Sequence, residues 1–312
     1  MEIEYKSRNP TFDVLKGIGI IFVILGHTPQ YGSIRHLIFS FHMPLFFFIS
    51  GYLMKERSIG EECVSSAKGL LLPYAITSCC LCFFSFVFFD RCSLGKNTSM
   101  AFFSALWGGS SWTQLSFFES PLYIGPLWFL CALFFVRIIY SIMQRIGFTK
   151  HVYISSVFVL CIAALAKYFV AVGENAFFSF FPALGALSFF HTGILLRKYK
   201  ILERFENLFP VCCACWIWCM GFSNVELHAN VYSYFVVIDI MAALMCFFML
   251  FKFVENFYDG KKIFWFSLRK IGRCSLFILC VHSFDHCLLV QWRSVSFWEA
   301  SSTCVEAFRQ PC

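Results

Sequence analysis

Long apolar segments recur along the chain, and each has roughly the length that crosses a lipid bilayer as a helix. About 20 apolar residues span the hydrocarbon core, and a spanning segment must bond its own backbone polar groups, which favours helices. The sequence therefore predicts an all-α, polytopic transmembrane helical bundle with about nine spans. The nine predicted spans are Phe12–Thr28, Ile34–Met54, Ala67–Phe89, Ile124–Met143, Val152–Val172, Phe177–Leu196, Leu208–Phe222, Tyr232–Val254 and Arg273–Val290.

The composition agrees with a membrane location. Hydrophobic residues make up 59% of the chain and charged residues only 14%, and the mean hydropathy is +0.71. A soluble domain carries about 25% charged residues, so lipid must cover much of this apolar surface. The net charge of +7 does not indicate nucleic acid, because Lys and Arg cluster in short segments between the apolar runs. We expect membrane lipids as partners and no nucleic acid.

The positive residues predict a cytoplasmic N-terminus, because short cytoplasmic loops are enriched in Lys and Arg. With that orientation, 17 of the 25 Lys and Arg residues lie on the cytoplasmic side, five lie on the opposite side and three lie within spans. The long loop Asp90–Tyr123 then lies outside. We expect a multi-pass protein of a bacterial-type inner (plasma) membrane. The 17 are Lys6, Arg8, Lys55, Arg57, Lys68, Arg145, Lys150, Arg197, Lys198, Lys200, Arg204, Lys252, Lys261, Lys262, Arg269, Lys270 and Arg273.

The chain is predicted to form one transmembrane domain over residues 1–292. The start of the chain lacks the small-residue cleavage site of a signal peptide, so the first apolar run is expected to be retained. Residues 293–312 are too polar and too few to cross the bilayer. They are predicted to be a short polar tail, disordered or aberrant.

The first predicted span carries three residues that lipid disfavours. An ionisable side chain at the centre of a span costs about 2.5–3.5 kcal/mol on insertion scales, so each needs a reason. Asp13 and Lys16 are three residues apart and can pair across one turn. Lys16 and His27 are eleven residues apart, so they share a helix face and lie roughly 16 Å apart along the axis. One helix thus places a cation near the cytoplasm and an imidazole nearer the outside.

An alternative without function exists for each of these residues. Asp13 and Lys16 can extend to the cytoplasmic interface, and His27 can be an interfacial histidine. A second intramembrane histidine on the next span, His42, favours a buried polar site over this alternative. Pro44, two residues after His42, can open the helix ladder there.

Further polar and aromatic residues fall at the ends of other spans. Lys68 begins the third span on the cytoplasmic side, and Trp128 lies near the outer end of the fourth. His282 lies within the last predicted span. No His, Cys, Asp or Glu cluster has the spacing of metal ligands, so no metal site and no bound cofactor are predicted.

With these motifs in this order, the chain resembles the membrane acyltransferase-3 superfamily, and especially its fucose 4-O-acetylase-like branch. The pattern of a basic residue, ten positions and then a histidine is met by Lys16 and His27. The other segments that carry the resemblance are Phe41–Tyr52, Lys68–Tyr74, Gly125–Leu130, Asn224–Ser233 and Gly272–His282.

The resemblance implies an integral-membrane O-acyltransferase, most simply an O-acetyltransferase. It would move an acetyl group from cytoplasmic acyl-CoA to a sugar hydroxyl of a surface polysaccharide or a lipid-linked glycan. His27 is the expected catalytic base or acyl acceptor, with His42 as a second catalytic candidate. Lys16 and Lys68 are expected to bind acetyl-CoA, and Asp13, Trp128 and His282 to shape the site.

Two features depart from the family pattern. The basic residue of the first span is often Arg in the wider family, whereas Lys16 is a point charge without a planar fork. The family generally has ten spans with both ends cytoplasmic, and a tenth span is missing from our assignment.

Two other functions remain open from the sequence. A transporter or flippase could use the same intramembrane His and Lys side chains to bind or relay ions. The third alternative is a membrane subunit without catalytic activity.

Overall fold

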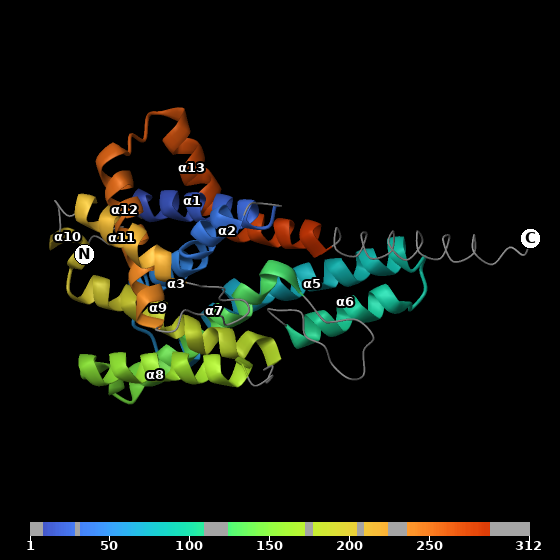
Figure 1. Cartoon of the computed structure of the whole chain (residues 1–312). Helices are drawn as coiled ribbons and strands as arrows, with labels where there is room; N and C mark the ends of the chain where they lie inside the picture. Colours follow the sequence, from blue (N-terminus) through green and yellow to red (C-terminus); the bar gives the residue numbers. More distant parts are fainter. Residues whose placement is uncertain are drawn as a thin grey trace, which may run out of the picture.

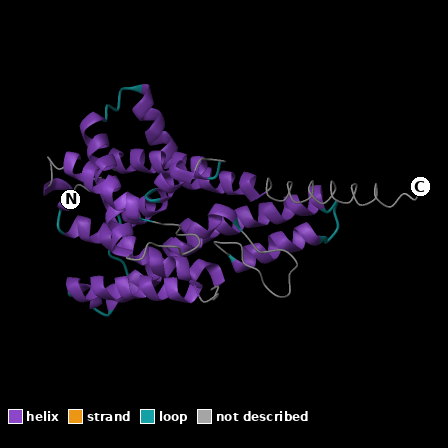
Figure 2. Ribbon diagram, viewed as in Figure 1, coloured by secondary structure: helices purple, strands orange, loops and turns teal. Residues whose placement is uncertain are grey.

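A computed structural model of the chain describes residues 9–28, 32–108, 124–171, 177–204, 209–223 and 236–287. These residues form helices joined by short turns, and no strand occurs among them (Figure 2). The predicted all-α class is therefore confirmed. The α-helices are α1 Pro10–Gly26, α2 Gly32–Phe39, α3 His42–Tyr52, α4 Ile59–Ser66, α5 Leu72–Phe84, α6 Lys96–Trp107, α7 Trp128–Arg145, α8 Val152–Ala171, α9 Phe180–Lys198, α10 Ile201–Arg204, α11 Phe209–Phe222, α12 Val236–Phe257 and α13 Ile263–Arg273.

After α13, residues 275–287 are again helical, and this stretch is called helix 275–287 below. The last predicted span therefore begins with a turn at Cys274 and not with a continuous helix from Arg273. The predicted outer segment Asn224–Ser233 and the predicted tail 293–312 lie outside the described residues.

Six helical segments of the described chain are long and apolar enough to cross a membrane. The predicted number of about nine spans is not confirmed, because α1 and α11 have only 17 and 14 residues and helix 275–287 has 13 described residues. The N-terminal orientation is not tested by the fold and stays a prediction. The six segments are Gly32–Tyr52, Ile59–Phe89, Gly125–Arg145, Val152–Phe169, Phe180–Lys198 and Val236–Phe257.

The second predicted span is broken between α2 and α3. A proline ring clashes with the carbonyl group four residues earlier, which for Pro44 is that of Ser40. The helix ends at Phe39 and restarts at His42. In the first turn of α3 the missing N–H of Pro44 leaves no backbone bond unmade. The expected opening of the helix at Pro44 is thus confirmed.

Helices α4 and α5 belong to one continuous helical stretch, Ile59–Phe89, of 31 residues. Two π-helical segments, Ala67–Leu71 and Ser85–Phe89, interrupt its α-helical winding. At 1.5 Å per residue the stretch is about 46 Å long, longer than the ~30 Å hydrocarbon core. Part of it must leave the hydrocarbon, and the polar first turns of α4 are suited to that.

Two pairs of helices approach each other closely through glycines. A methyl group on Gly17 of α1 would lie 2.2 Å from the Leu268 carbonyl oxygen of α13, and one on Gly272 would lie 1.6 Å from that of Asp13. Gly51 of α3 and Gly193 of α9 are related in the same way, each facing a backbone carbonyl of the other helix. Small residues allow this approach in membrane helix pairs.

The inner and outer helices differ in how much of their surface the protein covers. About two thirds of Gly125–Arg145 and of Phe180–Lys198 is buried (67% each), compared with 22% of Val152–Phe169. Helices α5 and α6 pack against each other and project from the body of the molecule, with α6 lying inside the predicted outer loop (Figure 1). The buried helix α7, together with α1 and α3, borders the region described next.

Candidate functional site

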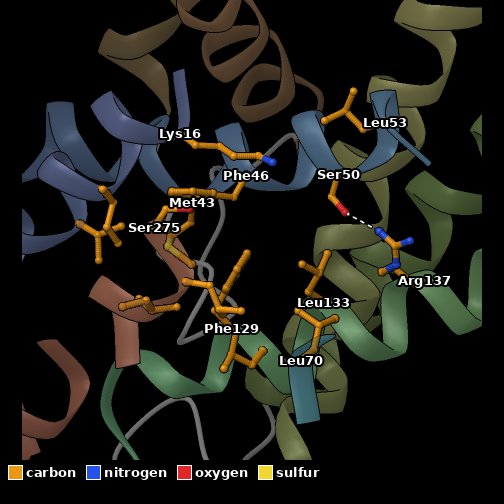
Figure 3. Close-up of a pocket in the computed structure, with 15 residues that line it drawn as sticks. Lys16, Met43, Phe46, Ser50, Leu53, Leu70, Phe129, Leu133, Arg137 and Ser275 are labelled. Atoms are coloured by element: carbon orange, nitrogen blue, oxygen red, sulfur yellow. Dashed lines mark hydrogen bonds between the residues drawn. The ribbon is translucent and has the colours of Figure 1, made fainter. Parts of the chain in front are cut away.

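A cavity of about 220 Å³ lies between α1, α3, α7, the start of the 59–89 stretch and helix 275–287. Most of its wall is apolar, and two of its lining residues, Lys16 and Arg137, are charged. Figure 3 shows the side chain of Lys16 extending from α1 toward the side of the cavity where Ser50 and Arg137 lie. The cavity therefore combines a narrow apolar space with two cations. The other lining residues are Ile20, Val23, Met43, Phe46, Leu53, Leu70, Phe129, Leu130, Leu133, Ser275, Leu276 and Leu279.

Arg137 is held by residues of two neighbouring segments. Its Nε donates to Glu62 Oε1 at 2.6 Å and to Ser66 Oγ at 3.0 Å. Its Nη1 donates to Ser50 Oγ at 3.1 Å, the bond drawn in Figure 3. Glu62 is fully buried, and its second oxygen lies 3.5 Å from Arg57 Nη1. A carboxylate at this depth requires paired cations, and two guanidinium groups supply them.

One face of α1 runs from the cavity to His27. Lys16, Ile20 and Val23 line the cavity, and His27 continues this series at the spacing i, i+4, i+7, i+11, which keeps all four on one side of a helix. His27 itself is half-buried and does not line the cavity. It lies one turn beyond the lining residue Val23.

Helix 275–287 repeats this spacing opposite α1. Ser275 and Leu279 line the cavity, and His282 and His286 follow at i+7 and i+11 on the same side of the helix. Both rings lie against the ring of His27, at centroid distances of 5.1 and 5.0 Å. Two helices thus pass from a shared cavity into a shared group of histidines, called the histidine cluster below.

The protonated nitrogen of His27 is set by its neighbour on α1. Nδ1 lies 2.7 Å from the Val23 carbonyl oxygen, which can only accept, so Nδ1–H donates. The lone pair is then on Nε2. Within the described chain, Nε2 of His282 is buried and has no hydrogen-bond partner. Such a ring nitrogen is unusual in a protein interior and marks the cluster as a place for a further polar group.

The other predicted site residues lie in different surroundings. His42 is buried, and its Nδ1–H donates to the Ile38 carbonyl at 2.8 Å. Lys68 is exposed on the 59–89 stretch and does not line the cavity. Trp128 is buried at the start of α7. Asp13 is 1% exposed and accepts a bond from Arg273 Nε at 3.3 Å, so it joins α1 to α13.

The structure therefore brings Lys16 to the cavity, and His27 and His282 to the histidine cluster, but it does not place Lys68, His42 or Trp128 at either. Arg137 and Glu62 were not predicted as site residues. Their signal in the sequence was the arginine within the fourth apolar run, which needs a buried partner. His286 was also missed, although it lies one turn after His282.

The histidine cluster is not arranged as a metal site. Within the described ranges, no three His, Cys, Asp or Glu side chains could hold a metal ion.

Comparison with known proteins gives one match over most of the chain. A family model described as an acyltransferase domain matches residues 9–294. Over 86 residues the chain is 38% identical to nodulation protein NolL of Sinorhizobium fredii (strain NBRC 101917 / NGR234), a match that covers 22% of this chain and 22% of that protein. The chain thus spans about a fifth of the length of this curated relative (22%). No solved structure matches it.

Proposed function

The chain belongs to the family of acyltransferase domains whose model matches residues 9–294, and on that premise we propose that it is an integral-membrane O-acetyltransferase of glycans. Membership confirms the predicted enzyme class, an acyltransferase of groups other than aminoacyl groups. Cytoplasmic acetyl-CoA is the proposed donor. A sugar hydroxyl of a surface polysaccharide or of its lipid-linked precursor is the proposed acceptor, and the inner membrane of a bacterial cell is the proposed location. The resemblance to the fucose 4-O-acetylase-like branch stays a prediction.

One observation carries this proposal: a cavity with two cations and a cluster of imidazoles lie along the same faces of α1 and helix 275–287. An acyl-CoA donor is anionic at one end and carries its thioester at the end of a long thin arm. Cations suit the phosphates, and imidazole suits the acyl transfer itself. On α1 the cation of Lys16 and the imidazole of His27 lie roughly 16 Å apart along the helix axis.

The proposed reaction uses the lone pair on His27 Nε2. As the sugar oxygen attacks the thioester carbonyl, Nε2 takes the hydroxyl proton, the C–S bond breaks and a C–O ester bond forms. The imidazolium then returns the proton to the departing thiolate, so the products are the acetylated sugar and free CoA. In the alternative order, Nε2 attacks the thioester carbonyl, the C–S bond breaks and CoA leaves as a thiolate. The sugar oxygen then attacks the acetyl group on Nε2, the N–C bond breaks, and the hydroxyl proton goes to the thiolate.

The size of the cavity limits which part of the donor it can hold. Pockets for drug-sized ligands measure about 300–1,000 Å³, and this cavity measures about 220 Å³. It suits a narrow chain and not a whole nucleotide. Lys68, exposed two residues before the lining residue Leu70, is the proposed contact for the part of the donor outside the cavity.

The proposal is tested by replacing the imidazole of His27. Membranes that contain His27→Ala should lose transfer of labelled acetyl from acetyl-CoA to glycan by about 100-fold or more, because general acid–base catalysis contributes about 10²–10⁴-fold. His151→Ala is the matched control, since His151 is exposed at the start of α8 and far along the chain from the cluster. Immunoblotting should show equal amounts of all three proteins.

Each result decides between the functions considered. Unchanged acetyl transfer by His27→Ala would reject the role of His27. Movement of a glycan or ion across the membrane by the wild-type protein, without any need for acetyl-CoA, would favour the transporter or flippase. Loss of transfer in His27→Ala but not in His151→Ala supports the enzyme.

A further inference from the structure

We propose that Arg137, oriented by Glu62, is a donor-binding residue that recognises a phosphate group of the acyl thioester. This inference rests on the proposed function and adds to it a residue that the sequence analysis did not assign. It starts from the position of Arg137 in the wall of the cavity that also contains Lys16.

The bonds made by Arg137 leave part of its guanidinium group for a ligand. A guanidinium group has five N–H donors. Glu62 and Ser66 share the Nε hydrogen, and Ser50 takes one hydrogen of Nη1. The three other hydrogens, on Nη1 and Nη2, have no partner among the described residues. Their planar arrangement suits two oxygens of one phosphate.

The positive charge of Arg137 is only partly neutralised by Glu62. That carboxylate also faces Arg57 at 3.5 Å, so two guanidinium groups share one negative charge. Lys16 adds a further cation to the same cavity, whose lining contains no Asp or Glu. The apolar wall lowers the local dielectric constant and strengthens attraction for an anion.

The positions of Lys16 and Glu62 agree with a donor that enters from the cytoplasm and reaches Arg137. In the predicted orientation α7 runs toward the cytoplasm, and Arg137 lies eight residues before its end at Arg145. Glu62 lies near the beginning of the 59–89 stretch, and Lys16 lies near the beginning of α1. Glu62 and Lys16 are thus nearer to the predicted cytoplasmic ends of their helices than to the outer ends, and Arg137 lies at the middle of α7.

The experiment compares two donors that differ in their phosphates. Acetyl-CoA carries phosphates, whereas S-acetylpantetheine carries the same thioester and none. For the wild type we expect a lower KM with acetyl-CoA. Arg137→Met should raise the KM for acetyl-CoA by about tenfold, the loss expected for a charge-assisted hydrogen bond, and should leave the KM for S-acetylpantetheine unchanged. Arg145→Met, an exposed arginine on the same helix, is the matched control.

A structural role for Arg137 would give a different result. Arg137→Met leaves the buried Glu62 with one partner fewer, which can unfold the protein. The double variant Glu62→Gln/Arg137→Met removes both charges and avoids this problem, and it should show the same loss of preference between the donors. Arg137→Lys keeps the charge without the planar fork, so it should restore the preference only in part.

The outcomes separate the two proposals. Equal loss of activity with both donors in all three variants, or an unchanged preference for acetyl-CoA, would overturn the role of Arg137 while acetyl transfer itself stands. Failure of the wild-type protein to transfer acetyl from either donor would reject the proposed function, and the role of Arg137 with it.

Discussion

Asp90 shows how one side chain fixes a helix outside the predicted spans. Its carboxylate accepts bonds from the backbone N–H and side chain of Thr98, both at 2.6 Å, and from the Asn97 side chain at 2.9 Å. These donors belong to the first turn of α6, whose N–H groups have no partner within the helix. Burial raises the pKa of Asp90, but the bonds from Thr98 and Asn97 outweigh it, so the pKa is lowered overall.

The lowered pKa of Asp90 predicts how the stability of α6 depends on pH. The contribution of an acid with a depressed pKa is complete above its unfolded pKa of about 3.9 and is lost as the pH falls through its folded pKa. We therefore expect hydrogen-exchange protection of the Thr98 amide, corrected for intrinsic rates, to be constant from pH 8 to about pH 5. It should fall only below pH 4.

Replacing Asp90 tests the same bonds at neutral pH. Asp90→Ala should lower the protection of the first turn of α6 by about fivefold to thirtyfold, since removing a capping side chain costs about 1–2 kcal/mol. Asp259→Ala is the control. Asp259 also accepts a backbone bond, from the Lys261 N–H, but it lies far from α6 along the chain. Equal protection in the wild type and Asp90→Ala would contradict this role.

Single residues of the site were only partly predictable from the sequence. Lys16 and His27 were found because both lie in one apolar run, where helical spacing alone places them on one face. Arg137 and Glu62 are 75 residues apart, so their pairing depends on how α4 packs against α7. Spacing within one segment carries no information about that packing.

At the scale of helices, the α3–α9 contact depends on the absence of two side chains. A methyl group on Gly51 would lie 2.1 Å from the Phe190 carbonyl oxygen, and one on Gly193 would lie 2.2 Å from that of Phe48. Backbone atoms cannot move aside as a flexible side chain can, so either substitution forces the two helices apart. The contact between α3 and α9 is among the most extensive in the fold.

Gly51→Ala and Gly193→Ala are each expected to lower the thermal stability of the protein in detergent. Overpacking typically costs about 1–3 kcal/mol, which corresponds to a decrease in melting temperature of several degrees. Gly221→Ala is the matched control, because its added methyl group meets no atom within 4 Å. A melting temperature equal to that of the control would show that the helices can separate at no cost.

The sequence predicted most helices and one helix break, but not the ends of the spans. Hydropathy located the apolar runs, because the length of an apolar segment decides whether it can cross the bilayer. Pro44 predicted an opening of the helix ladder, and the helix breaks just before α3. The turn at Cys274 was missed. It lies two residues after Gly272, whose close contact with the backbone of α1 is not reported by hydropathy.

At the scale of the whole molecule, the predicted orientation can be tested with the exposed cysteines. Cys63 on α4 and Cys92 after the 59–89 stretch are both exposed and lie at opposite ends of that stretch. If the N-terminus is cytoplasmic, a membrane-impermeant maleimide should label Cys92 in intact cells and Cys63 only after permeabilisation. Mass spectrometry of the two peptides measures both. The reverse pattern would invert the predicted topology.

The rigidity of α1 has a consequence for the choice of substrate. Lys16 lies within α1, an uninterrupted helix of 17 residues, and His27 is the residue that directly follows it. The distance between the two residues is therefore fixed while the helix is intact. With the proposed roles of Lys16 and His27, this fixed spacing selects the donor by the length of its arm. A thioester whose arm is much shorter than roughly 16 Å would engage the cation or the imidazole, but never both at once.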